Sequence, residues 1–221
     1  TINNSTDRTY GGVITGNLSL VKQGTPTQTL SGSSANTYTG TTTVQDGRLH
    51  LSKSSGVNAI GGDLVISGGG VTFGASDQLP NTATVTMSGG TLNGTAADTN
   101  RRDNHTETIA SLTMTGGVFQ SGITSNWTIS GDGAITGGTG ARVIFNSGAQ
   151  ISFNSLSLTN MTAATPGPNN FILYGNRADA RTTLTIGSGG LTLNNSMLNL
   201  RRGSVENAQG SRVVLNGNVT T

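Results

Sequence analysis

Short alternating segments punctuated by glycine recur along the chain. Each unit has an apolar–x–apolar stretch, then Ser, Thr or Asn, then a glycine corner, then a second short stretch. The unit recurs, in looser form in some copies, at 64–73, 85–92, 112–119, 127–135, 143–151 and 184–193. Alternation with a period of two is typical of a half-buried β-strand, and glycine breaks such strands where the backbone turns sharply. The pattern therefore predicts many short strands and almost no helix.

The spacing of these units predicts how the strands are arranged. Units starting at Leu64, Val85 and Leu112 lie 21 and 27 residues apart. A repeat of roughly 20–50 residues indicates stacked units that cannot bury their apolar face alone. The rival, an antiparallel sandwich or barrel, would favour Asn-Gly or Asp-Gly hairpin turns, whereas the corners here are mostly Gly-Gly or Ser-Gly. We expect an all-β fold, a right-handed parallel β-helix (solenoid) with short three-strand coils.

Two segments interrupt the repeat. Residues 95–108 contain Ala96-Ala97-Asp98, and residues 161–170 contain Thr165-Pro166-Gly167-Pro168. Because neither segment alternates, we expect both to be loops that protrude from the coils. Residues 1–221 as a whole, including these two loops, are interpreted as a single β-helix segment from a longer protein.

Composition supports a thin repeating core over other classes. The apolar fraction is 32%, against about 45–50% for an average globular domain. Disorder usually brings high charge, yet only 10% of the residues are charged. The absence of cysteine excludes disulfides, thiolate catalysis and Cys-type zinc sites. No apolar run reaches 18 residues, so we expect no direct insertion into a membrane.

Charge is distributed unevenly along the chain. Residues 142–221 hold six arginines and two acids, a net of +4, whereas residues 1–141 have a net of −2. Arg177, Arg181, Arg201 and Arg202 form the candidate patch for a polyanion or another partner. Nucleic acid would require many phosphate contacts and usually interleaved aromatic residues, and neither is evident, so we expect no nucleic-acid partner.

One stretch of the chain resembles a known family. It reads Leu20-Val21-Lys22-Gln23-Gly24, Gln28-Thr29-Leu30-Ser31-Gly32, Asn36-Thr37-Tyr38-Thr39-Gly40, Thr42-Thr43-Val44 and Gly47-Arg48-Leu49-His50-Leu51. Residues 20–51 resemble the autotransporter-associated β-strand repeat, also called the passenger-associated transport repeat. The family pattern is Leu-x-Lys-x-Gly, Gly-Thr-Leu, Ser-Gly, Asn-x-Tyr-x-Gly, x-Thr-x-Val and Gly-x-Leu-x-Leu. Thr25-Pro26-Thr27 adds about two residues to it, and Gln28 replaces a glycine.

The matching positions are expected to have structural roles. They are Lys22, Gly24, Leu30, Gly32, Asn36, Tyr38, Gly40, Val44, Gly47, Leu49 and Leu51. Asn36 suits a tight left-handed turn, and Tyr38 could lay its ring over a coil edge with its hydroxyl in water. Gly40 and Gly47 would form corners, while Val44, Leu49 and Leu51 would alternate inward.

The resemblance implies a segment of a bacterial autotransporter passenger. Such a passenger crosses the outer membrane through its own C-terminal β-barrel in type V secretion, and its coils fold on one another at the cell surface. The implied partners are that barrel and the adjacent passenger coils. The implied location is secreted or on the bacterial cell surface, reached through the periplasm and the outer membrane.

No catalytic, metal or cofactor site emerges from the residues. The ten acids are scattered singly, with Asp132 the best lone candidate for glycoside chemistry. His105 and Glu107 lie in the most polar segment, which is interpreted as a solvated loop. We therefore expect a non-catalytic stalk that supports secretion and display. The alternatives are an adhesin segment that binds a host glycan or self-associates, and, less favoured, a polysaccharide-cleaving β-helix enzyme.

Overall fold

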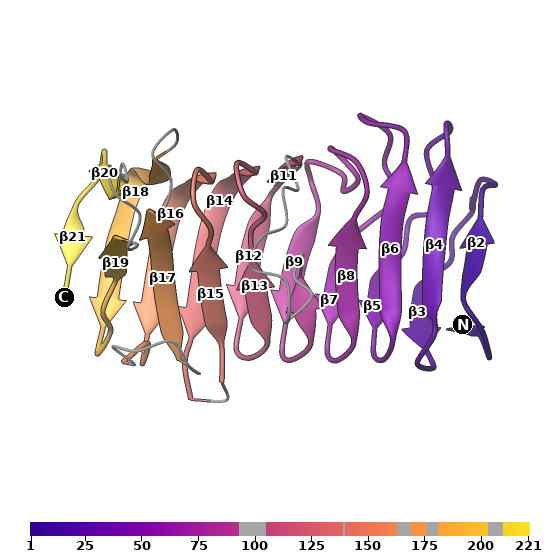
Figure 1. Cartoon of the computed structure of the whole chain (residues 1–221), viewed down its shortest axis with the longest axis horizontal. Helices are drawn as coiled ribbons and strands as arrows, with labels where there is room; N and C mark the ends of the chain where they lie inside the picture. The colour runs from indigo at the N-terminus through magenta and orange to yellow at the C-terminus, as the bar shows by residue number, and fades with distance from the viewer. Residues whose placement is uncertain (93–104, 139, 163–168, 176–180, 203–209) are drawn as a thin grey trace.

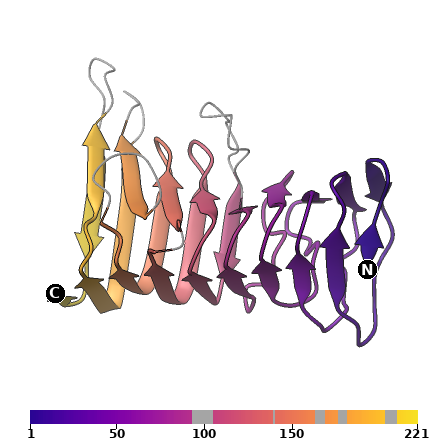
Figure 2. The same ribbon diagram turned by 90° about the horizontal axis from the view of Figure 1, so that it is seen from below.

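The computed structural model describes residues 1–92, 105–138, 140–162, 169–175, 181–202 and 210–221. Within them the chain forms a β-solenoid of about eight turns. Figure 1 shows the coils stacked along the long axis with the termini at opposite ends, and Figure 2 shows the same stack from below. The strands belong to two sheets, here called sheet A and sheet B.

The strands have the following bounds. Sheet A contains β1 (Ile2–Asn3), β3 (Leu20–Gln23), β5 (Thr42–Val44), β7 (Leu64–Ile66), β9 (Thr84–Met87), β11 (Thr106–Ile109), β12 (Ser111–Met114), β14 (Asn126–Thr136), β16 (Gln150–Thr159), β18 (Thr182–Asn194), β20 (Ser211–Leu215) and β21 (Val219–Thr220). Sheet B contains β2 (Arg8–Tyr10), β4 (Thr27–Gly32), β6 (Arg48–Lys53), β8 (Gly70–Phe73), β10 (Thr91–Leu92), β13 (Val118–Gln120), β15 (Arg142–Phe145), β17 (Asn170–Gly175) and β19 (Asn199–Arg202).

The predicted parallel stacking is confirmed. In sheet A, Leu64 is in register with Val85, and Val85 with Leu112, all in parallel pairs. The strand β7 has the alternating burial of a surface strand, with Leu64 and Ile66 buried and Val65 partly exposed. Inward side chains of successive coils thus form continuous rows, because parallel strands about 4.8 Å apart bring equivalent positions into contact.

The number of strands per coil changes along the solenoid. From β11 onward each full coil has three strand segments, because the long strands β14 and β16 bend at register shifts after Ile129 and Phe153 and continue. Earlier coils have two strands and an irregular third side. That side is joined by backbone hydrogen bonds between coils, such as Ala59 N to Gln78 O at 2.7 Å. The predicted three-strand coil therefore describes the C-terminal half.

The interior contains a ladder of aromatic rings. Phe73, Phe119, Phe145 and Phe171 come from sheet B, and Trp127 enters from sheet A. Trp127 lies edge-on to Phe73 and Phe119, with centroid distances of 5.5 and 4.9 Å. Edge-to-face contacts of this kind add to the stabilisation that burial of the rings provides.

The positions of three repeat units differ from the prediction. The units at 127–135 and 184–193 lie on the bend of β14 and β18, and the unit at 143–151 runs from β15 in sheet B to β16 in sheet A. None of the three occupies the corner from sheet A to sheet B at which the units at 64, 85 and 112 lie. Leu112 is in register with Gly133, and Glu107 with Trp127. The assignment was wrong because apolar–x–apolar followed by Ser-Gly or Gly-Ser occurs at both kinds of corner.

Most residues of the predicted loops at 95–108 and 161–170 are not described by the structure. Residues 93–104 and 163–168 lie outside the described residues. At the edges of the two predicted loops, however, residues 106–108 belong to β11 and Asn170 begins β17. Glu107 is fully buried, so the interpretation of its segment as solvated is wrong. Its side chain lies inward because it satisfies backbone groups of the preceding coil.

Candidate functional site

A column of glycines forms the corner at which the chain passes from sheet A to sheet B. The column has one residue from each of five successive coils: Gly24, Gly47, Gly69, Gly90 and Gly117. All five have positive φ, and a Cβ on Gly47 would lie 2.2 Å from the carbonyl oxygen of Gly24. Both the left-handed backbone and the close approach favour glycine. The predicted corner at Gly47 is confirmed.

Lys22 lies beside this column and is almost fully buried. Its Nζ donates hydrogen bonds to the carbonyl oxygens of Gln23 at 2.7 Å, Gly24 at 2.5 Å and Asp46 at 3.4 Å. The first two belong to its own coil and the third to the next coil. Burial lowers the pKa of the Lys22 ammonium, and the nearby Asp46 charge acts in the opposite direction. Lys22 therefore caps part-buried carbonyls at the corner.

Asn36 links three coils on the irregular side. Its Oδ1 accepts a hydrogen bond from Ile14 N at 2.9 Å, and its Nδ2 donates to Ala59 O at 2.6 Å. Its backbone N–H also donates to Asn58 O at 3.0 Å. The residue does not have positive φ, so the expected left-handed turn is wrong. The amide instead carries a donor and an acceptor in opposite directions, which no aliphatic side chain can replace.

Tyr38 and Gly40 complete this side of the repeat. The Tyr38 ring is fully buried, and its hydroxyl is hydrogen-bonded to Thr42 Oγ1, so the expectation of a wet hydroxyl is wrong. Burial raises the pKa of this hydroxyl. Gly40 lacks positive φ, but a Cβ there would lie 2.4 Å from Leu18 O. Its role is close approach between coils.

The remaining motif positions behave as the alternation predicts. Leu30, Val44, Leu49 and Leu51 are all buried, and Gly32 has positive φ at the end of β4. Each of the four apolar residues belongs to the main core cluster. The repeat therefore provides the core of its coil as well as the caps.

A second network of polar side chains, which the sequence interpretation missed, connects three later coils. Lys53 is buried, and its Nζ donates to Gly12 O at 3.1 Å and Ser31 O at 2.9 Å. Its backbone N–H donates to Gln78 Oε1 at 2.7 Å. Gln78 N in turn donates to both carboxyl oxygens of Glu107, at 3.0 and 3.1 Å. The sequence does hold a signal for Lys53, since this residue continues the inward phase of Leu49 and Leu51.

Among the described residues, Glu107 is the last member of this hydrogen-bond network. Its Oε2 also accepts from Leu79 N at 3.2 Å. Burial raises the pKa of the Glu107 carboxyl to about 8, and the nearby Asp77 charge adds to the increase, while hydrogen bonds from backbone N–H groups oppose it. The site is thus a set of buried polar side chains that hold successive coils together: Lys22, Asn36, Lys53, Gln78 and Glu107. We call this set the inter-coil clamp.

The other candidate residues are not brought together. Arg177 lies outside the described residues; Arg181 is exposed just before β18, and Arg201 and Arg202 are part of β19. Asp132 is exposed and accepts a hydrogen bond from Ser155 at 2.6 Å. Within the described ranges, no group of three or more His, Cys, Asp or Glu residues is placed to hold a metal ion.

Fold and clamp together define the class of protein, a parallel β-solenoid whose coils are joined by buried polar side chains. Residues 20–51 match the family model of the Passenger-associated-transport-repeat. The chain therefore carries an autotransporter passenger repeat, as its motif predicted. No curated protein and no solved structure gives a significant match. In the part of the chain that the structure describes, no helix has the length and apolar character needed to cross a membrane.

Proposed function

We propose that the chain is a non-catalytic stalk of a bacterial autotransporter passenger, secreted or held at the cell surface. One observation carries the proposal. The residues that match the transport repeat include the whole coil whose Lys22 and Asn36 bond the neighbouring coils. Stacked repeats are stabilised through nearest neighbours, so a coil clamped on both sides can template those around it.

The proposed partners are the adjacent passenger coils and the outer-membrane barrel of the parent protein. Apolar side chains exposed at the two ends of the stack support adjacent coils as partners. Tyr10 is 44% exposed in the first coil, and Leu215 and Val219 are 43% and 48% exposed in the last. Covering such side chains with a further coil would remove apolar surface from water.

The adhesin alternative has less support. It depends on Arg177, Arg181, Arg201 and Arg202 acting as one surface, and of these only the side chain of Arg181 is described. Binding of a host glycan or self-association through this patch therefore stays a prediction. The polysaccharide-cleaving alternative has less support too, because Glu107, which lies near Asp77, is buried against backbone N–H groups and not exposed to a substrate.

The stalk proposal is tested by surface display of the secreted protein that contains this chain. We expect deletion of residues 20–51, or the double variant Lys22→Met/Asn36→Ala, to lower display several-fold. The reason is that coils released from the clamp stack less efficiently during secretion. Display is measured by antibody labelling of intact cells.

The matched control is Arg48→Met, which removes an exposed cation from the adjacent coil, within the same repeat. It should display like the unaltered protein. Circular dichroism of the purified double variant should keep its β-sheet signal. Unchanged display of both the deletion and the double variant would refute the proposed role of the repeat.

A further inference from the structure

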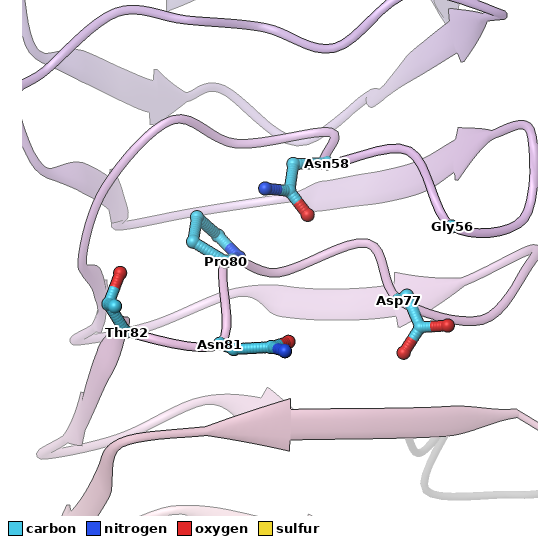
Figure 3. Close-up of a pocket in the computed structure, with 6 residues that line it drawn as sticks. All are labelled: Gly56, Asn58, Asp77, Pro80, Asn81 and Thr82. Carbon is cyan, nitrogen blue, oxygen red and sulfur yellow. The ribbon is translucent and has the colours of Figure 1, made fainter.

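The irregular side of the early coils contains a hollow between two successive corners. It has a volume of about 540 Å³. Figure 3 shows the residues that line it: Gly56, Asn58, Asp77, Pro80, Asn81 and Thr82. They come from the segments before β7 and before β9, where the coil has no third strand. Sites for small molecules usually have volumes of about 300–1,000 Å³.

The polar side chains of this hollow make no hydrogen bond to other described residues. Among the residues that the structure describes, Asn58, Asp77, Asn81 and Thr82 make no side-chain hydrogen bond. Elsewhere on the solenoid, amides and carboxylates commonly pair between coils. The Gln23 amide donates to the Gln45 amide oxygen at 2.6 Å, for example. The hollow thus gathers two amides, one carboxylate and one hydroxyl with free hydrogen-bonding capacity.

The backbone that carries these side chains is held rigidly. Gly56 N donates to Ser76 O at 3.1 Å, and Asp77 N donates to Thr106 O at 2.8 Å. The next two residues after Asp77 are capped by the buried Glu107 carboxyl. A ligand that enters would therefore find the groups already in place, which lowers the entropy lost on binding.

We propose that this hollow binds a neutral saccharide unit, an activity beyond the proposed stalk role. Amides and a carboxylate can together donate to and accept from adjacent sugar hydroxyls. The Pro80 ring provides a small apolar face for sugar C–H groups. The Asp77 carboxylate repels uronic or sialic acids, so the ligand is neutral. Calcium sites in proteins commonly use carboxylates together with carbonyls and waters, and the side chains of this hollow include a single carboxylate, so a sugar fits them better.

The test uses the full chain and a panel of methyl glycosides of glucose, galactose, mannose, N-acetylglucosamine and N-acetylgalactosamine. Binding is detected by saturation-transfer difference NMR, and dissociation constants come from titration. We expect at least one glycoside to bind, with a dissociation constant of about 1–10 mM, as suits a small ligand with few contacts. Methyl glucuronide should bind at least fivefold more weakly.

Two variants locate the binding. Asp77→Asn removes the charge but tolerates the positive φ of 56° at this position, and Asn81→Ala truncates an exposed amide. Each should weaken binding by roughly tenfold, the loss expected for one hydrogen bond to a polar ligand. Asp132→Asn, the matched control on a distant coil, should leave it unchanged.

In the sugar experiments, three outcomes would overturn the proposal. They are no binding of any glycoside at high millimolar concentration, binding that neither Asp77→Asn nor Asn81→Ala weakens, and tighter binding of methyl glucuronide than of the neutral sugars. Calcium chloride alone, added without sugar, should not shift the NMR signals of the chain. A calcium-induced shift that Asp77→Asn abolishes would assign the hollow to a cation instead.

Discussion

Protonation of Glu107 is expected to control the stability of the solenoid between mildly acidic and mildly alkaline pH. The carboxyl group is buried, and its pKa rises from an ordinary 4.5 to about 8. Between these values the folded chain holds a proton that the unfolded chain has released. The contribution of Glu107 to the free energy of unfolding is therefore greatest below about pH 4.5. It falls as the pH rises and levels off above about pH 8.

The size of the effect follows from the width of this window. One pH unit corresponds to about 1.4 kcal/mol when one proton separates the two states. A window of about 3.5 units then gives about 5 kcal/mol at most, comparable with the whole unfolding free energy of many domains. Asp77 is the neighbouring charge that contributes to this increase.

The measurement is urea unfolding at pH 5 and pH 8, followed by fluorescence. Trp127 is the single tryptophan of the chain, is buried, and is in register with Glu107 on the adjacent strand. Its emission therefore reports on the coil in question. We expect a markedly lower urea midpoint at pH 8 than at pH 5.

Glu107→Gln is the decisive comparison. The neutral amide keeps an oxygen that can accept from Gln78 N or Leu79 N but cannot ionise. Its urea midpoint should be nearly the same at pH 5 and pH 8, and at pH 8 it should exceed that of the unaltered chain. Equal pH dependence in both proteins would refute the assignment to Glu107.

Two further changes test the caps and the corners. Lys22→Met should lower the unfolding free energy by about 1.5–3 kcal/mol, since it leaves part-buried carbonyls without a charged donor, whereas Arg48→Met should change it little; urea titration measures both. Gly90→Ala should destabilise by at least about 2 kcal/mol more than Gly56→Ala in thermal unfolding. Both glycines have positive φ, but only at Gly90 would a Cβ meet backbone, at 2.5 Å. Equal losses would refute the steric argument.

The periodic part of the fold could be predicted from the sequence. Alternation in Leu64-Val65-Ile66 and the repeated glycine corners carry the information for parallel stacking, because both depend on local backbone geometry. The corner at which the units at 127–135 and 184–193 lie could not be predicted from the sequence. Both kinds of corner use the same residue types, and only pairing with another coil distinguishes them.

The clamp was only partly predictable. The motif drew attention to Lys22 and Asn36, but not to the contacts they make, which involve backbone groups about 22 residues away in sequence. The polarity of its segment predicts a solvated loop for Glu107, yet the side chain is buried. Its partners are backbone N–H groups, and every residue except proline carries one, so no sequence pattern marks them.

The clamp also explains why a single coil would not be stable alone. The side chains of Lys53 and Glu107 hydrogen-bond backbone groups that belong to other coils. Without those coils the same side chains would stay in water. Burying them would then cost free energy, because no hydrogen bond to a neighbouring coil would replace the bonds to water. Docking of a neighbour supplies both the partners and the apolar cover in one step. Stability therefore resides in the contacts between coils, as expected when stacked repeats fold by propagation from one coil to the next.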